Sequence, residues 1–289
     1  MNDFLVSFLL GIVEGLTEFL PISSTAHLRI VEAMFGLNLH DSFWKMYTIV
    51  IQLGAILALP VYFWNRILKF IATFPRGERG DRNFLTHPLS LTMIAFVVTA
   101  VPAWALKKQI GENLEKLWVI ALALLIGGVV MWIVDAMFTR PRVTYMEEMN
   151  LPQAIWIGAC QILSAFFPGT SRSMSTIAAG QVASLSRPAA LEFSFFLSMP
   201  TMAVATLYDL YKTLKPNRNT INEGNLAPLA VDPHQWIVLA IGLVVSFLVA
   251  LAVVSWFMRW VRTKGFAPFA IYRIVLGIVL IILLMRGSL

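Results

Sequence analysis

Residues 14–27 have the sequence Glu14-Gly15-Leu16-Thr17-Glu18-Phe19-Leu20-Pro21-Ile22-Ser23-Ser24-Thr25-Ala26-His27, and they lie within otherwise apolar sequence. Ionisable side chains are costly in hydrocarbon, so they usually mark a functional site there. Glu14 and Glu18 are four residues apart, which places them on one face of a helix. Pro21 ends a helix, and Ser23 or Ser24 can cap a new one that begins near Thr25. The stretch predicts two helices separated by a polar break.

The same pattern recurs 147 residues further along the chain, at residues 158–173. The aligned pairs include Glu14 with Gln161, Thr17 with Ser164, Pro21 with Pro168, Ser24 with Ser171 and His87 with His234. We therefore predict an internal duplication, with residues 1–146 as the first repeat and 147–289 as the second. Chance resemblance between apolar segments is the alternative.

Composition places the chain in the membrane. Of its 289 residues, 58% are hydrophobic and only 13% are charged, as in integral membrane proteins. The net charge of +6 is typical of membrane-protein loops. The basic residues stand singly between apolar stretches, which argues against nucleic-acid binding. Cys160, the single cysteine, excludes an internal disulfide and a cysteine-rich metal site.

We predict an all-α integral membrane protein with six transmembrane helices and two re-entrant helical hairpins. The hairpins cover residues 3–36 and 151–183. The helices within each hairpin are too short to cross the bilayer. The spans cover residues 43–64, 88–106, 117–138, 189–211, 235–258 and 267–285. Residues 65–84 and 212–233 are predicted polar loops. Since three spans per repeat is an odd number, the repeats should have inverted topology, and their broken helices should meet near the midplane.

The polar groups at the two breaks suit a phosphorylated ligand. Helix N-termini near Ser24 and Ser171 favour anions, and Arg172 provides a planar fork for phosphate oxygens. Gly169 lets the backbone approach an anion closely. His27 can move a proton, and Glu14 with Glu18 can hold Mg²⁺ or Ca²⁺. Together these groups indicate phosphoryl transfer. A transporter or flippase of a polyprenyl phosphate, or of a small anion, is the alternative, because broken helices in inverted repeats are also transporter architecture.

The predicted catalytic residues are Glu18, Ser24, His27 and Arg172. Ser24, taken to occupy the capping position, is the predicted nucleophile, with His27 as its general base. A phosphohistidine at His27 and a metal-bound water are the alternatives. Glu192 and Arg273 are intramembrane charges for which supporting roles are favoured over direct chemistry, and Arg29 with Glu32 is predicted to form a simple ion pair.

These motifs resemble those of a known family. Glu14-x-x-x-Glu18, Pro21-x-Ser23-Ser24-Thr25-x-His27 and Pro168-Gly169-x-Ser171-Arg172-Ser173-x-x-Thr176 look like the signatures of the BacA/UppP undecaprenyl-diphosphatases. The resemblance covers nearly the whole chain. It implies hydrolysis of the C55 polyprenyl diphosphate to the monophosphate carrier of envelope synthesis, with bacitracin tolerance. The substrate-binding residues expected beside the catalytic ones are Ser23, Thr25, Gly169, Thr170, Ser171, Ser173 and Thr176.

The expected partners are the lipid diphosphate and the bilayer of the bacterial cytoplasmic (inner) membrane, with no nucleic acid; a homodimer is left open. Loop charge predicts the orientation. One side of the spans has eleven Lys and Arg residues and the other has seven. By the positive-inside bias the first side is cytoplasmic, so the first hairpin and its catalytic residues should open to the periplasm or cell exterior.

Overall fold

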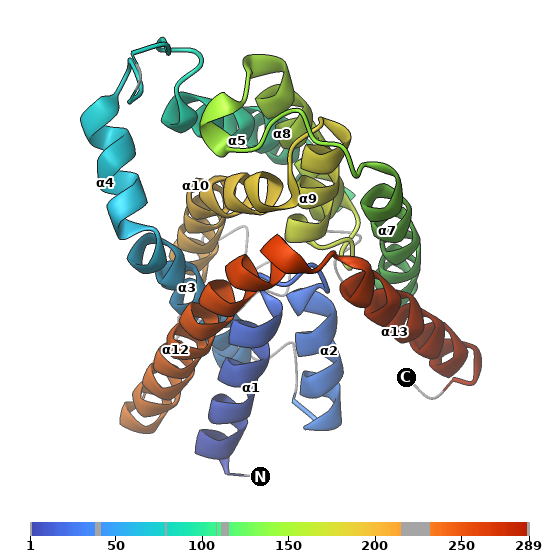
Figure 1. Cartoon of the computed structure of the whole chain (residues 1–289). Helices are drawn as coiled ribbons and strands as arrows, with labels where there is room; N and C mark the ends of the chain where they lie inside the picture. The colour runs from blue at the N-terminus through green and yellow to red at the C-terminus, as the bar shows by residue number, and fades with distance from the viewer. Residues whose placement is uncertain are drawn as a thin grey trace. The chain divides into compact units, whose positions relative to one another are not determined.

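The computed structural model describes residues 2–37, 42–78, 80–107, 109–110, 116–214 and 232–287. Within them the chain is helical, with one isolated β-bridge between Val143 and Leu185. The chain divides into two compact units. Unit 1 comprises Met1–Phe19, His27–Tyr62 and Ser198–Val254, and unit 2 comprises Leu20–Ala26, Phe63–Leu197 and Ser255–Leu289. Each unit contains residues from both predicted repeats. The helices α10 (Arg187–Leu214) and α12 (Pro233–Thr263), labelled in Figure 1, each contribute residues to both units.

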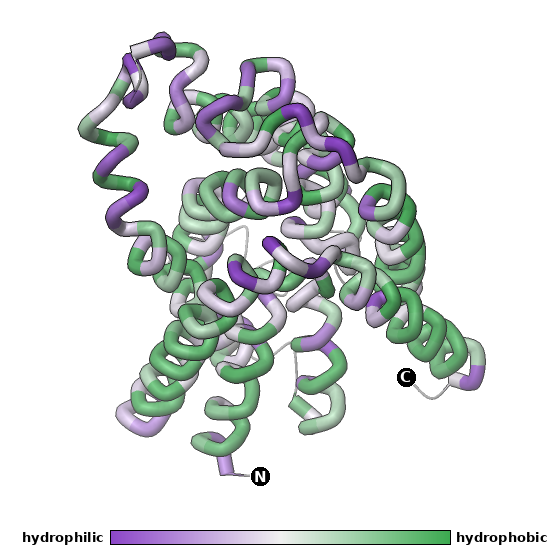
Figure 2. Tube along the Cα trace, viewed as in Figure 1, coloured by the Kyte–Doolittle hydropathy of each residue, from purple (hydrophilic) through white to green (hydrophobic). Residues whose placement is uncertain are grey.

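Six helices of the described chain are long and apolar enough to cross a membrane, as predicted. They are α3 (Ser42–Tyr62), α5 (Pro88–Ala105), α7 (Leu117–Met137), α10 (Arg187–Leu214), α12 (Pro233–Thr263) and α13 (Ala267–Met285). Figure 2 shows α7, α12 and α13 as mostly hydrophobic along their length. The all-α membrane class is thus confirmed, while the inverted topology and the re-entrant hairpins stay predictions.

Both predicted breaks are present. The first separates α1 (Asp3–Thr17) from α2 (Ser24–Met34), and the second separates α8 (Leu151–Phe166) from α9 (Arg172–Val182). In each case the chain leaves the helix a few residues before a proline, Pro21 or Pro168, and a serine precedes the next helix. None of these four helices exceeds 16 residues, about 24 Å at 1.5 Å per residue, which is shorter than a typical membrane span.

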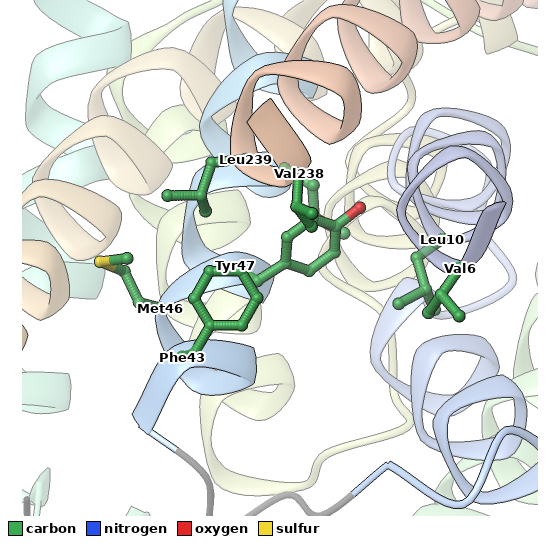
Figure 3. Close-up of a cluster of buried hydrophobic side chains, with 8 residues drawn as sticks. Val6, Leu10, Phe43, Met46, Tyr47, Val238 and Leu239 are labelled. Carbon is green, nitrogen blue, oxygen red and sulfur yellow. The ribbon is translucent and has the colours of Figure 1, made fainter. Parts of the chain in front are cut away.

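The core of unit 1 joins α1, α3 and α12. Their buried side chains point toward one another in Figure 3 and form one cluster, consisting of Val6, Leu10, Phe43, Met46, Tyr47, Ile51, Val238 and Leu239. Two hydroxyls connect the helices through this cluster. Tyr47 donates to the Ser7 carbonyl at 2.7 Å, and Ser7 donates to the Val238 carbonyl at 2.7 Å. Both hydroxyls are thereby satisfied away from water, where an unmade hydrogen bond would be costly.

Glycines let α1 approach α12 closely in unit 1. A Cβ added at Gly11 would lie 3.0 Å from the Gly242 carbonyl oxygen, and one added at Gly15 would lie 2.8 Å from the Ser246 carbonyl oxygen. The packing of α8 on α5 in unit 2 has the same character. A Cβ at Gly158 would lie 2.5 Å from the Ala95 carbonyl oxygen.

These two contacts are related by the offset of the predicted duplication. Gly158 is the repeat counterpart of Gly11, and Gly242 is the counterpart of Ala95. In unit 2, Thr99 also donates to the Gly158 carbonyl at 2.7 Å. Its counterpart, Ser246, donates to the Ile51 carbonyl at 2.7 Å in unit 1. The first helix of one half thus packs on the same position of a helix from the other half.

In unit 2, α7 and α13 lie side by side (Figure 1), with small residues at their contact. A Cβ at Gly277 would lie 2.8 Å from the Leu125 nitrogen. At one end of the pair, the buried Asp135 carboxylate accepts hydrogen bonds from Arg187 Nε at 2.7 Å, from the Phe266 N–H at 2.9 Å and from the Gln181 amide. Asp135 therefore joins α7, α9, α10 and the start of α13.

One prediction about the loops is wrong. Residues 65–84 are not all loop, because Trp64–Thr73 form helix α4. Its charges stand at helical spacing and are used in contacts: Arg66 Nε donates to Glu192 at 2.8 Å and lies over the Phe70 ring. The other predicted loop, residues 212–233, lies almost entirely outside the described residues.

We predict that Gly15→Ala destabilises the protein by roughly 1–3 kcal/mol, the scale of overpacking, because the new methyl meets backbone atoms of α12 that cannot rotate away. Thermal unfolding in detergent measures the effect. Leu16→Ala, on an exposed face of α1, is the matched control and should shift the midpoint less. Equal midpoints for the two variants would contradict the close α1–α12 approach.

Candidate active site

The predicted site residues are distributed over the two units. Glu14, Glu18 and His27 belong to unit 1. The hydroxyl residues of both breaks belong to unit 2, together with Gly169 and Arg172. The residues of the first break, Leu20–Ala26, are therefore packed with the second break in one compact unit.

At the first break, the structure corrects the identity of the capping residue. Ser23, not Ser24, precedes α2, and its Oγ accepts from the Ala26 N–H at 3.4 Å. Ser23 has a φ of 74°, a left-handed conformation that is uncommon for residues other than glycine. Ser23 is buried, while Ser24 is the first helical residue and remains partly accessible. The prediction that Ser24 occupies the capping position is therefore wrong.

The second break is built in the same way. Ser171 has a φ of 69° and caps α9, its Oγ accepting from the Met174 N–H at 3.4 Å. Gly169 has a φ of 96°, and a Cβ there would lie 2.5 Å from the Ile120 carbonyl oxygen, so this position needs glycine for conformation and for space. Arg172 is the first residue of α9 and is partly accessible.

The two breaks therefore correspond with a shift of one residue from the predicted alignment. Ser23 corresponds to Ser171 as the cap, and Ser24 corresponds to Arg172 as the first residue of an 11-residue helix. The physical reason is the chain length after proline. Two residues, Ile22 and Ser23, follow Pro21 up to the cap, whereas three follow Pro168.

Specific hydrogen bonds hold the two breaks together within unit 2. Ser173 Oγ donates to the Leu20 carbonyl at 3.1 Å. Arg273 Nη1 donates to the Pro21 carbonyl at 3.1 Å, and Arg273 Nη2 donates to the Gly169 carbonyl at 3.0 Å. Arg273 Nη2 also donates to the Ala123 carbonyl of α7 at 3.1 Å. One fully buried arginine thus contacts both breaks.

Burial separates the hydroxyls into two groups. The Thr176 side chain is fully buried, and its hydroxyl pairs with that of Ser194 at 2.6 Å and donates to the Arg172 carbonyl at 2.9 Å. Thr170 and Ser173 are also buried. Ser24 and Ser171 are partly accessible, and Thr25 is exposed. Only the second group can meet a ligand without rearrangement.

Three carboxylates approach one another in unit 1. Glu14, Glu18 and Glu32 are all at least nine-tenths buried, and Glu18 and Glu32 both lie within electrostatic range of Glu14. The two carboxylate oxygens of Glu14 have no hydrogen-bond partner among the described residues. Glu32 also forms the predicted pair with Arg29, at 3.7 Å. His27 is partly accessible.

These carboxylates are chemically suitable ligands for a cation, but they do not form a complete metal-binding site by themselves. The unpartnered oxygens of Glu14 are suitable ligands for a hard divalent ion. No three His, Cys, Asp or Glu side chains in the described part of the chain are arranged to hold a metal by themselves. Mg²⁺ commonly uses one or two carboxylates and takes its remaining ligands from water and substrate phosphates.

The fold and this site define a class: an integral membrane protein in which two helix N-termini, each capped by a serine with a positive φ, and two arginines are gathered at paired helix breaks. Such helix starts bind anions, and phosphate above all. The model of the family described as "Bacitracin resistance protein BacA" matches residues 7–279. This chain belongs to that family.

Curated relatives agree over nearly the full length. The undecaprenyl-diphosphatase of Koribacter versatilis is 61% identical over 279 residues, which cover 96% of this chain and 97% of the relative. Undecaprenyl-diphosphatase 2 of Paramagnetospirillum magneticum is 42% identical, covering 98% of this chain and all of the relative. The undecaprenyl-diphosphatase of Caldanaerobacter subterraneus subsp. tengcongensis is 38% identical, covering 98% and 97%. The predicted family is therefore confirmed.

The corrected cap makes a testable distinction between neighbouring serines. We predict that Ser23→Ala lowers the free energy of unfolding by about 1 kcal/mol, the usual cost of losing a serine cap. Ser24→Ala should cost less, because Ser24 is the first residue within α2 and does not stand at the cap position. Chemical unfolding of both variants in detergent measures the difference. A larger loss for Ser24→Ala than for Ser23→Ala would refute the assignment.

Proposed function

We propose that this chain hydrolyses undecaprenyl diphosphate to undecaprenyl phosphate and inorganic phosphate. It thereby recycles the lipid carrier for peptidoglycan and other envelope polymers and confers bacitracin resistance. The names of the relatives support this activity. The structural observation that carries it is the pairing of two capped helix starts by Arg273 and Ser173, since this pairing gathers anion-binding N–H groups in one unit.

Four residues carry the chemistry in this proposal. Arg172, the first residue of α9, binds the diphosphate and stabilises the charge that develops as the terminal phosphoryl group transfers. Ser24 is the nucleophile, a role favoured by its partial exposure beside the buried Ser23. His27 acts as its general base, and Glu18 assists from the end of α1. Water attacking directly and a phosphohistidine at His27 are the rival routes.

In this proposal, the buried members of the predicted substrate-binding residues have supporting roles. Ser23 caps α2, and Thr176, Thr170 and Ser173 hold the breaks in shape. Thr25 and Ser171, which are accessible, are proposed to contact phosphate oxygens, whereas Gly169 is buried and is proposed to support the second break.

A divalent cation, Mg²⁺ or Ca²⁺, forms part of the proposal. Glu14 and Glu18 would hold it, and Glu14 supports this with two buried oxygens that have no hydrogen-bond partner in the described chain. When bound, such an ion would neutralise charge on the diphosphate. A homodimer stays a prediction.

The chain is a multi-span membrane protein, and we place it in the bacterial cytoplasmic membrane with its active site open to the outer face. The support for this orientation is the excess of Lys and Arg on the side of the 65–84 segment. Inverted repeats, which the corresponding α1–α12 and α8–α5 contacts support, would give the two halves opposite directions in the membrane.

Purified protein in detergent should release phosphate from a polyprenyl diphosphate, and Glu18→Gln should nearly abolish that release while leaving the protein folded. Glutamine has nearly the size and polarity of glutamate but no negative charge, so the lost activity measures the contribution of that charge. Excess chelator should also stop the reaction. Full activity in excess chelator, after purification without divalent ions, would contradict the proposed requirement for a divalent cation. Binding of the lipid without phosphate release would favour the transporter alternative.

Cysteine labelling tests the orientation. In a Cys160-free background, we expect Asp81→Cys to react with a membrane-impermeant maleimide only after permeabilisation, because the 65–84 segment is assigned to the cytoplasm. Arg286→Cys, exposed at the end of α13, should react in intact cells or spheroplasts and serves as the matched control. Labelling of Asp81→Cys in intact cells would invert the topology.

A further inference from the structure

We propose that Arg273 is a positioning residue for the hydrolysis. Its guanidinium sets the relative position of the two helix starts, and the bound diphosphate supplies the countercharge that no carboxylate supplies. This inference rests on the proposed function. Its physical basis is a buried cation whose hydrogen-bond acceptors are all main-chain carbonyls.

The charge of Arg273 is unusual in its surroundings. The side chain is fully buried, and its guanidinium donates to three carbonyl oxygens, those of Pro21, Ala123 and Gly169. Its Nε has no hydrogen-bond partner, and among the described residues no carboxylate pairs with it. A buried charge without a countercharge is costly, so a nearby anion is favoured.

Two other arginines in unit 2 differ in this respect. Arg187 pairs with Asp135 at 2.7 Å, and Arg66 pairs with Glu192 at 2.8 Å. Both are also more exposed than Arg273, with side chains that are 35% and 26% accessible. The most buried of the three arginines is thus the one without a carboxylate partner, and it is the one that contacts both breaks.

The position of these contacts connects Arg273 to the reaction. Pro21 lies two residues before the cap of α2, and Gly169 lies two residues before the cap of α9. Moving the guanidinium would therefore move both helix starts, whose N–H groups are proposed to hold the phosphate oxygens. Such groups stabilise a transition state only when they are held in place beforehand. Arg273 touches the backbone of the breaks and need not touch the substrate.

Two adjacent packing sites allow the guanidinium to be disturbed without removing it. A Cβ at Gly127 would clash with Arg273 Nη2 and would lie 2.7 Å from Met174 Cε, so Gly127→Ala crowds the guanidinium together with the end of a flexible methionine. Gly277→Ala crowds the same α7–α13 contact but meets the Leu125 nitrogen and the Ala121 carbonyl oxygen instead. Both substitutions strain the helix pair, and only the first displaces the guanidinium.

The experiment measures kcat and KM on a polyprenyl diphosphate, together with the inhibition constant of inorganic pyrophosphate, for equal amounts of folded protein. We expect Arg273→Met to lower kcat by about 100-fold or more, the scale of losing a preorganised donor. The inhibition constant of pyrophosphate should rise at least about tenfold, which is the effect expected from losing a charge that favours the anion. KM should change less than kcat, because the lipid tail still binds.

Arg273→Lys should keep pyrophosphate binding closer to wild type than Arg273→Met, while kcat stays low, because lysine retains the charge but not the planar fork.

Unchanged kcat and pyrophosphate inhibition in folded Arg273→Met would overturn the proposal. If that variant does not fold, the glycine pair decides. Gly127→Ala should weaken pyrophosphate inhibition and Gly277→Ala should not, whereas equal inhibition in both would overturn it. Wild-type protein that releases no phosphate would instead contradict the proposed function, so the two failures are distinguishable.

Discussion

The backbone carbonyls at the two helix breaks impose the constraint on which the rest of unit 2 depends. A chain that leaves a helix inside apolar packing exposes carbonyl groups that need donors. Arg273 meets this need at both breaks at once, with one planar group bonded to Pro21, Gly169 and Ala123. A hydroxyl could satisfy one such carbonyl, but a guanidinium has five N–H donors in a fixed plane and so also fixes their geometry.

The glycines around this arginine follow from the same constraint. At Gly169 the backbone turns with a positive φ and passes close to the Ile120 carbonyl, so no side chain fits. At Gly127 the missing side chain leaves the room that the guanidinium occupies. The two capping serines, at φ values of 74° and 69°, accept a strained backbone in the same region. Strain of this kind persists only where surrounding contacts hold it, and the Ser173–Leu20 hydrogen bond is one such contact.

Hydropathy and proline positions were sufficient to predict the six spans and both breaks, because these features depend on local sequence. Three details were not predictable from local sequence. The Arg273–Pro21 contact joins residues 252 positions apart, and no periodicity reports such a pairing. Ser23 is the cap, and it has a left-handed backbone conformation that is typical of glycine. The residue type therefore did not indicate this conformation. Helix α4 was not predicted because its charged residues suggested a loop. In the structure, Arg66 of this helix forms ion pairs with Glu192 and Glu147.

The corresponding positions of the two halves have the same packing and different chemistry. Gln161 is neutral, and its amide donates to Thr99 at 3.2 Å, which completes the α8–α5 contact. Its counterpart Glu14 has a carboxyl group in place of the amide, and both of its oxygens lack hydrogen-bond partners among the described residues. The first residue of the broken helix is Ser24 in one half and Arg172 in the other. The predicted duplication would thus supply carboxylates from one repeat and the Arg172 guanidinium from the other. A diphosphate needs both kinds of group, because its charge must be held while its terminal phosphorus is attacked. The second break has hydroxyls of its own, such as Ser171 beside Arg172, so the difference between the predicted repeats lies in their charged groups: Glu14 and Glu18 in the first and Arg172 in the second.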